Sequence, residues 1–216
     1  MKKILYLTYR YPFKNGPHCS FGQNVFYEVL KTQYEVRGIC FENIDLNDNN
    51  FIFIKRESNI LKKAVKLIFG IPIRQTHYYS KGYKNLVQNE LTIFSPDIIF
   101  VEHTVMMQYV RQKIPGVKIF FFDDESMIFA ESNKLLKSIK EKLKNIFMSV
   151  KEKESIIRSD VVFTITNQEK NFLSKEGYKN VEFLPYGIDS KYYYYNWQPY
   201  SEKNNWQPSS KKIKVQ

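Results

Sequence analysis

Two short runs near the middle of the chain are apolar at nearly every position, and they constrain the fold more than any other feature. They span residues 97–101 and 117–122. Strands that are buried on both faces of a parallel sheet have such continuous apolar runs, whereas strands with one solvated face alternate between apolar and polar residues. The two runs therefore predict interior strands of a parallel sheet that is covered on both faces.

Segments with strand character alternate with helical segments along the rest of the chain. Further strands are expected at 1–8, 35–41, 51–54, 160–165 and 181–184. Helical patterns are expected at 21–30, 58–70, 81–94, 104–113, 132–158 and 168–176. This alternation predicts an α/β fold: a Rossmann-like, doubly wound, mainly parallel sheet of about seven strands flanked by helices, with right-handed crossovers.

Charge and cysteine content limit the environment of the protein. The 216 residues include 33 Lys and Arg against 22 Asp and Glu, a formal net charge of +11, which favours polyanions, anionic lipid surfaces or phosphorylated ligands. The two cysteines, Cys19 and Cys40, match no zinc spacing, so reduced thiols in a cytoplasmic protein are the default expectation. The apolar start is interrupted by Arg10 and Lys14, which is unlike a signal peptide, and no run of about 20 apolar residues predicts a spanning helix.

Five sequence blocks, in their order and spacing, carry a resemblance to a known family. They are residues 3–16, with Tyr11-Pro12 and Asn15-Gly16, and then 96–103, 122–126, 159–166 and 184–189. Together they resemble the amino-terminal domain of family 4-like glycosyltransferases. Those are GT-B enzymes, built from two Rossmann-like domains with the active site between them. The block Pro185-Tyr186-Gly187-Ile188-Asp189 is similar to the family's Pro-Asn-Gly-Val-Asp, with Tyr186 where Asn is usual.

The resemblance implies a division of the chain. Residues 1–190 would be the Rossmann-like acceptor-side domain, and residues 191–216 a linker or tail that ends in a truncated start of a second domain, since 212–216 resembles that domain's opening strand. In the family the second domain binds the nucleotide sugar. Retention of configuration and independence of metal follow from the same resemblance, so no metal and no cofactor are expected, and the nucleotide sugar is a substrate.

Acidic residues and one histidine follow the predicted interior strands, at the edge where parallel strands end. His103 follows one strand, and Asp123, Asp124 and Glu125 end another. Like charges held close together raise one another's pKa, so such a cluster could accept a proton from an acceptor hydroxyl. The family often has a His in the latter loop. Either Glu125 or Asp124 matches that position, which leaves the base open, and solvated acids that cap the following helix are the structural alternative.

The predicted site residues divide into two groups. Catalytic roles are expected for Asp124, Glu125 and His103. Substrate-binding roles are expected for Asn15, Gly16, Asp123, Thr166 and Asn167. Gly16 would let the backbone approach a phosphate or a sugar, although a simple turn glycine explains it equally well. The loop around it has no GxGxxG pattern, so a dinucleotide is disfavoured.

A basic amphipathic segment at 59–69, with Arg74 and Lys81 beyond it, suits an anionic membrane surface, although the solvated face of an ordinary helix explains it as well. The aromatic motifs of RNA-binding sheets are missing, so nucleic acid is disfavoured as a partner. The predicted localisation is therefore cytoplasmic, including the inner face of the membrane.

The resemblance implies transfer of a sugar from a nucleotide sugar to a glycan or lipid-linked acceptor in bacterial cell-surface polysaccharide synthesis. The chain is expected to be inactive without a donor-binding domain. One alternative is a non-catalytic module that recruits an acceptor or a membrane and acts with a separate partner chain. A further alternative is a nucleotide-binding domain of another α/β class.

Overall fold

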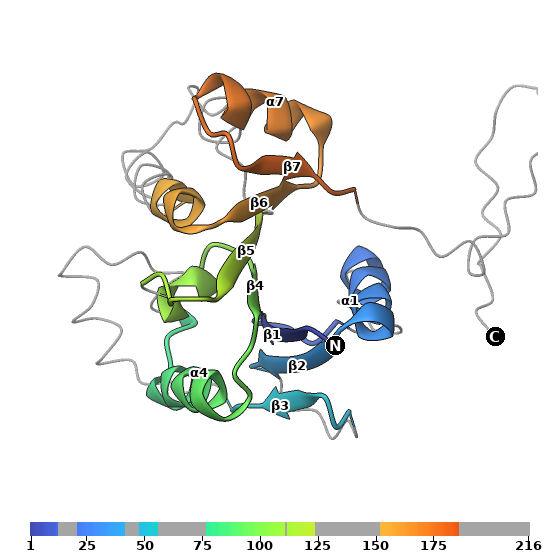
Figure 1. Ribbon diagram of the computed structural model, residues 1–216, viewed down its shortest axis with the longest axis vertical. Helices are drawn as coiled ribbons and strands as arrows, with labels where there is room; N and C mark the ends of the chain where they lie inside the picture. Colours follow the sequence, from blue (N-terminus) through green and yellow to red (C-terminus); the bar gives the residue numbers. More distant parts are fainter. Residues whose placement is uncertain (13–20, 42–47, 56–76, 111, 124–151, 186–216) are drawn as a thin grey trace, which may run out of the picture.

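The computed structural model describes residues 1–12, 21–41, 48–55, 77–110, 112–123 and 152–185 (Figure 1). The predicted helix at 58–70 and most of the one at 132–158 lie outside these residues, although residues 152–158 are helical. Among the described residues, no helix has both the length and the apolar character needed to cross a bilayer.

A seven-stranded parallel sheet forms the centre of the molecule (Figure 1). Its strands are β1 (Lys3–Leu7), β2 (Glu35–Cys40), β3 (Phe51–Phe53), β4 (Ile98–Glu102), β5 (Lys118–Asp123), β6 (Val161–Thr164) and β7 (Val181–Phe183). They lie in the order β3-β2-β1-β4-β5-β6-β7, and every neighbouring pair is parallel. The predicted Rossmann-like, doubly wound sheet is therefore confirmed.

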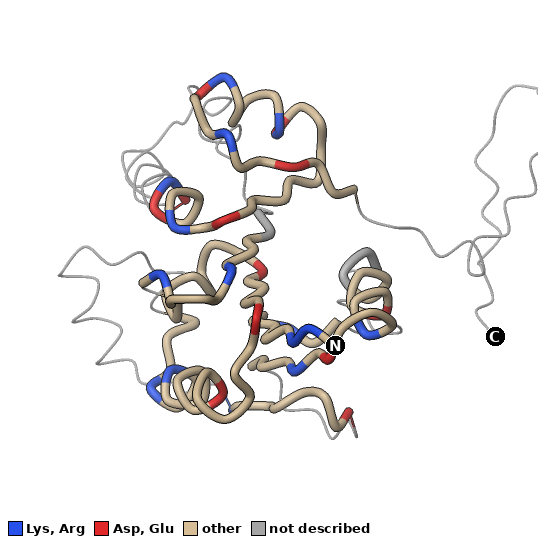
Figure 2. The backbone as a smooth tube through the Cα atoms, in the orientation of Figure 1, with Lys and Arg blue, Asp and Glu red and all other residues tan. Residues whose placement is uncertain are grey.

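Helices cover the sheet on both faces. The labelled ones are α1 (Phe21–Gln33), α4 (Lys81–Ile93) and α7 (Asn167–Lys175). Figure 1 shows α1 on one side of β1 and β2, and α4 on the other. Figure 2 shows basic and acidic residues interspersed along these helices.

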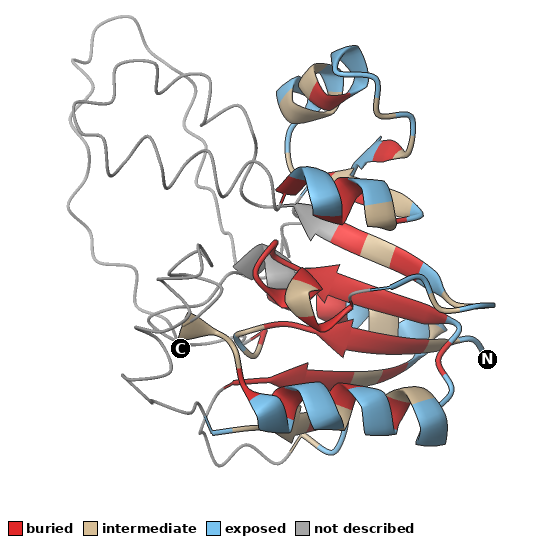
Figure 3. Cartoon of the chain, turned by 90° about the vertical axis from the view of Figure 1, so that its left-hand side faces the viewer, coloured by how far each residue is buried: buried red, intermediate tan, exposed pale blue. Residues whose placement is uncertain are grey.

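Two apolar cores separate the helices from the sheet, because alternate side chains of each strand point to opposite faces. On the α4 side the core contains Leu5, Ile99 and Tyr83, whereas on the α1 side it contains Tyr6, Phe100 and Tyr27. Figure 3 shows the resulting pattern, with the central strands buried and the outer faces of the helices exposed. Burial on both faces explains the continuous apolar runs in the sequence.

The helix predicted at 104–113 is wrong for most of its length. The structure has only a short 3₁₀ helix, η1 (Met106–Tyr109). Its backbone bonds span three residues, with the Met106 N–H donating to the His103 carbonyl and the Val110 N–H donating to the Met107 carbonyl. Val105, Met106, Met107, Tyr109 and Val110 are all buried. The tight loop is therefore packed on several sides, which explains why it is rich in apolar residues. Their spacing resembles one apolar face of a helix, although most of the segment is not helical.

One position in β2 requires glycine, because an aromatic side chain of β3 approaches its backbone closely. Gly38 lies opposite Phe51 in the parallel pair, and a Cβ atom at position 38 would come within 2.3 Å of the Phe51 ring. That ring cannot move aside freely, since it packs edge-on against Tyr6, Tyr11 and Tyr27. Gly38→Ala is therefore expected to destabilise the fold by about 1–3 kcal/mol through overpacking.

The Gly38→Ala effect is measurable as a change in the free energy of unfolding in urea. Adding Phe51→Leu to this variant should give a double mutant that loses less stability than the sum of the two single changes, because the smaller side chain relieves the clash. Strict additivity would contradict the proposed contact.

Candidate functional site

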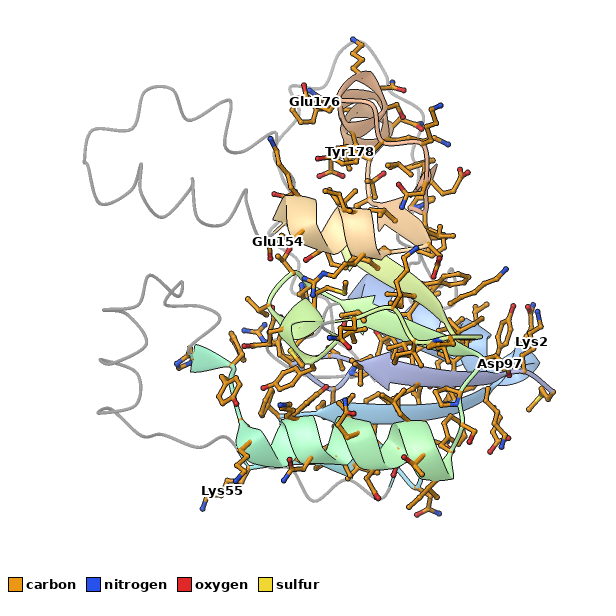
Figure 4. The ribbon with its side chains drawn as sticks, turned by 60° about the vertical axis from the view of Figure 1, so that its left-hand side comes forward. Lys2, Lys55, Asp97, Glu154, Glu176 and Tyr178 are labelled. Carbon is orange, nitrogen blue, oxygen red and sulfur yellow. The ribbon has the colours of Figure 1, made fainter. Side chains whose placement is uncertain are left out.

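The edge of the sheet at which β1 and β4 end is the place where a ligand is expected. The chain leaves β1 towards β2 and β3, whereas it leaves β4 towards β5, β6 and β7, so the strand order reverses between these two neighbours. In open α/β sheets a crevice for ligands opens at the carboxyl ends of the strands on either side of such a reversal. In Figure 4, Lys2 and Asp97 mark the opposite, amino edge, and Lys55 follows β3 at the carboxyl edge.

Polar side chains are buried at this edge, although burying apolar side chains there would cost less free energy. Thr8 and Glu102, which are 0% and 2% exposed, come from the ends of β1 and β4. The Thr8 hydroxyl donates a hydrogen bond to Glu102 Oε2 over 2.7 Å, and the Arg10 N–H donates to Thr8 Oγ1 over 3.3 Å. Burying a carboxylate is costly unless it is paired, so its presence at the reversal point is typical of a functional site.

His103 completes the buried group. Its Nε2 atom lies 4.0 Å from Glu102 Oε2, and the side chain is 5% exposed. Its backbone φ is +70°, in the left-handed region that most side chains avoid. A residue held in such a conformation costs of order 1–3 kcal/mol, and strain of this kind is found preferentially at functional sites.

Aromatic rings cover this buried group. The Tyr9 ring lies 4.3 Å from the His103 ring and 4.7 Å from the Tyr78 ring, measured between centroids. His77 meets Tyr78 at 5.1 Å with nearly perpendicular planes. Tyr9, His77 and Tyr78 are each half-buried, whereas the neighbouring Arg10 is exposed, with its guanidinium carbon 5.2 Å from the Tyr9 centroid. The His103 ring therefore packs against Tyr9, which in turn contacts Tyr78.

Helix α4 supports the site from below through Tyr83. This tyrosine is fully buried, and its hydroxyl lies 2.7 Å from the Ile39 carbonyl oxygen and 3.2 Å from that of Thr8. Burial raises the pKa of Tyr83 well above its usual value, so the hydroxyl keeps its proton at neutral pH. The ends of β1 and β2 are thereby tied to the first turn of α4.

A second polar cluster lies on the α1 side and is anchored by Asp48. Its Oδ2 atom accepts hydrogen bonds from the hydroxyls of Tyr11 (2.6 Å) and Tyr27 (3.1 Å), and its Oδ1 atom accepts one from the Asn50 N–H (2.9 Å). Partial burial and the adjacent carboxylate raise the pKa of both tyrosines. The cluster fixes the chain after β1, just before the predicted Asn15-Gly16 loop.

The protonation of Asp48 makes this cluster depend on pH. Partial burial alone would raise the pKa of Asp48, but the hydrogen bonds from Tyr11, Asn50 and Tyr27 outweigh it, and the net shift is downward. A carboxyl with a lowered folded-state pKa stabilises the fold above its unfolded-state pKa, and this contribution is lost as the pH falls through the folded-state pKa.

Asp48→Asn is expected to lower the free energy of unfolding by about 1 kcal/mol at pH 7, since an amide group replaces a charged acceptor. The deficit should vanish at a pH below the folded-state pKa of Asp48, where the wild-type carboxyl is itself protonated, and that pKa lies below its usual value. Urea unfolding at both pH values tests this expectation, with Glu35→Gln, at an exposed carboxyl, as the matched control. A deficit of equal size at both pH values would contradict the role of the charge.

The structure describes only some of the residues that the sequence predicts for the site. Asn15, Gly16, Asp124 and Glu125 lie outside the described residues, as does the side chain of Asp123, the last residue of β5. Their roles stay predictions.

Two further predicted residues lie at the start of α7. Thr166 is the N-cap, with its hydroxyl accepting from the Glu169 N–H and the Glu169 carboxylate accepting from the Thr166 N–H. Asn167 is the first helical residue. Thr166 thus has a structural task that accounts for its residue type, and the substrate-binding role of both residues stays a prediction.

Sequence reasoning missed Thr8, Tyr9, Tyr78 and Glu102 as members of the site. A signal for two of them exists: Thr8 directly follows β1, and Glu102 is a charged residue at the end of an otherwise apolar strand. No local signal marks Tyr78, which reaches the site because the amino end of α4, just after it, lies at the carboxyl edge.

A separate groove of about 520 Å³ lies between α4 and the segment around η1. Amide and ammonium groups line its rim, including Gln88, Gln108 and Lys113, and Ile99 contributes to its apolar part. Among the described residues, no three His, Cys, Asp or Glu side chains gather as metal ligands would.

Comparisons with known proteins bear on the fold. No family model matches the sequence, and no curated protein matches it. The structure is similar to sucrose-phosphate synthase from Thermosynechococcus elongatus, with a TM-score of 0.61, 10% identity and coverage of 90% of this chain and 50% of that chain. A second structure of that enzyme gives a TM-score of 0.50 at 9% identity, with coverage of 87% and 91%. The chain spans about half the length of the first of these proteins, and its fold is similar to that of the matched half.

Proposed function

We propose that this chain is the acceptor-side half of a GT-B glycosyltransferase, which holds a glycan or lipid-linked acceptor while a sugar is transferred to it from a nucleotide sugar. The observation that carries the proposal is the buried Thr8–Glu102–His103 group at the strand-order reversal, in a fold similar to half of a sugar-transferring synthase. Bacterial cell-surface polysaccharide synthesis at the cytoplasmic face of the membrane is the setting that the sequence resemblance implies.

The chemistry assigns separate tasks to the two halves. In transfer, the bond from the sugar's anomeric carbon to the nucleotide diphosphate breaks, a bond to the acceptor oxygen forms, and the acceptor hydroxyl loses a proton. His103, or one of Asp124 and Glu125, would take that proton, with Glu102 stabilising an imidazolium at His103. Stabilising the departing nucleotide needs preorganised donors, which we assign to the other half.

Calorimetry with the purified chain tests the proposal. We expect cellotetraose, chitotetraose or maltotetraose to bind with a dissociation constant in the micromolar to millimolar range, and we expect UDP, GDP and ADP to bind no more tightly. Nanomolar binding of a nucleotide, with no saccharide binding, would overturn the proposal and favour a nucleotide-binding domain of another α/β class.

A second candidate function is a non-catalytic module that recruits an acceptor or an anionic membrane for a separate donor-binding chain. The half-length match to the synthase favours a protein that works with another domain, whether fused or separate. Co-purification with a second polypeptide that carries a donor-binding domain would favour the module. A lone monomer that ignores vesicles containing phosphatidylglycerol would remove the recruitment function.

A further inference from the structure

The groove between α4 and the segment around η1 lies where the connection from β4 to β5 lacks a full helix. Of residues 103–117, which join these two neighbouring strands, the structure describes only η1 as helical. A groove of about 520 Å³ remains beside α4, within the range of about 300–1,000 Å³ that is usual for small-ligand sites. Its deepest residues are apolar and almost fully buried: Ile99, Tyr109 and Val110 are 0%, 4% and 3% exposed.

One face of α4 forms a wall of this groove. Lys84, Gln88 and Leu91 are spaced four and three residues apart, so they lie on the same face of the helix. Residues 108–110 and 112–115 form the opposite wall. The two walls are tied together, because the Tyr109 hydroxyl accepts a hydrogen bond from the Ser80 N–H, at the start of α4, over 2.8 Å. The groove is therefore formed before any ligand arrives, which lowers the entropic cost of binding.

The groove has a lysine at each end, and no Asp or Glu is among the described residues that line it. Lys84 lies toward the carboxyl edge, since the hydroxyl of its neighbour Tyr83 reaches carbonyl oxygens there. Lys113 lies toward the amino edge, where its ammonium group is 3.5 Å from Asp160 Oδ1, just before β6. Within the described part of the chain, no carboxylate pairs with Lys84. The Lys84 end is therefore the one whose charge most favours an anion.

We propose that this groove binds a single-chain lipid phosphate, with the phosphate at Lys84 and the hydrocarbon chain against Leu91, Val110 and Ile114. The Lys84 ammonium and the Gln88 amide supply donors for the phosphate oxygens, and the apolar residues supply a surface that shields the chain from water.

The inference rests on the proposed function for the source of this ligand, which is the lipid-linked acceptor. In such an acceptor the phosphate stands between the hydrocarbon chain and the sugar. A phosphate held at Lys84 would direct the sugar toward the carboxyl edge, where Glu102 and His103 lie.

Calorimetry on the full chain tests the groove, with decyl phosphate as the probe, kept below the concentration at which it forms micelles. Decyl maltoside has the same chain with a neutral head, and inorganic phosphate has the head without the chain. Each should bind at least about fivefold more weakly than decyl phosphate, since charge and chain both contribute. Decanoate, which stands for a free fatty acid, should also bind more weakly, because its head offers fewer acceptor oxygens and less charge.

A pair of variants on α4 locates the binding. Gln88→Glu places a carboxylate four residues after Lys84, where it neutralises that ammonium and repels the phosphate, so decyl phosphate should bind about tenfold more weakly or worse. Asn89→Asp makes the same change of charge at the next exposed position, outside the groove lining, and should bind within about twofold of the wild type. Lys84→Gln should weaken binding by about two- to fivefold. All three side chains are exposed on a helix surface, so the fold should be kept, and a thermal melt of each variant checks this.

The outcomes separate this inference from the proposed function. If the wild type does not bind decyl phosphate, if decanoate or decyl maltoside binds as tightly, or if Gln88→Glu binds like Asn89→Asp, the lipid phosphate site is overturned, and the proposed function stands if a saccharide binds the wild type. If decyl phosphate follows the expected pattern but no saccharide binds, the proposed function is overturned, together with the lipid-linked acceptor as the source, and the groove remains a lipid phosphate site.

Discussion

Replacing Tyr83 by alanine is expected to lower the free energy of unfolding by about 3–5 kcal/mol, the usual cost of removing a large buried aromatic side chain. Tyr83 is fully buried, stacks on Phe41 at 4.5 Å and meets Tyr109 at 4.4 Å. Its hydroxyl lies within hydrogen-bond distance of the carbonyl oxygens of Thr8 and Ile39, at the ends of two strands. The variant therefore loses ring packing and a hydrogen bond at the same place.

Tyr83→Phe separates the two contributions. It keeps the ring and removes the hydroxyl, which leaves buried carbonyl oxygens short of a donor at a cost of about 1–3 kcal/mol. Urea unfolding measures both variants, and Tyr34→Phe, at a half-exposed tyrosine next to the amino edge, should change stability by less than about 0.5 kcal/mol. If Tyr83→Phe were as stable as the wild type, the hydrogen bonding of Tyr83 to the ends of the two strands would contribute nothing to stability.

The second large effect concerns turnover. Residues 1–216 alone are expected to transfer no sugar from UDP- or GDP-linked donors, because the groups that stabilise the departing nucleotide belong to the other half in our proposal. Interactions of that kind account for a factor of about 10²–10³ each in enzymes that transfer groups. Release of free nucleotide, followed over hours with the oligosaccharide probes present, measures this.

This chain should stay at the background rate of nucleotide release. Turnover by this chain at about 1 s⁻¹ or faster, within the ordinary enzymatic range, would contradict the division of labour between two halves.

The sheet could be predicted from the sequence because each strand carries its own signal. Strand β4 is buried on both faces and is apolar up to Glu102, strand β5 is apolar between Lys118 and Asp123, and the turns between elements contain glycine, proline or Asx residues. The predicted bounds of these strands agree with the structure to within one residue at most ends. Parallel order followed from the alternation of strands and helices, since parallel neighbours need a crossover.

The site was less predictable because its contacts join residues far apart in the chain. Thr8 and Glu102 are 94 positions apart, and Asp48 lies 37 positions from Tyr11. Periodicity placed His103 at the carboxyl edge, but it gave neither the left-handed backbone nor the ring of Tyr9 above it. Those features depend on how α4 and the turn after β1 pack together, which no local pattern encodes.

The most direct test of the central claim is to map saccharide binding on the amide NMR spectrum of isotopically labelled protein. The proposal predicts that the preferred oligosaccharide shifts amides at the carboxyl edge, around Thr8–Arg10, Tyr78–Ser80 and Glu102–Thr104. Shifts confined to the amino edge, around Lys2, Tyr34 and Asp97, or no shift with any saccharide, would contradict it.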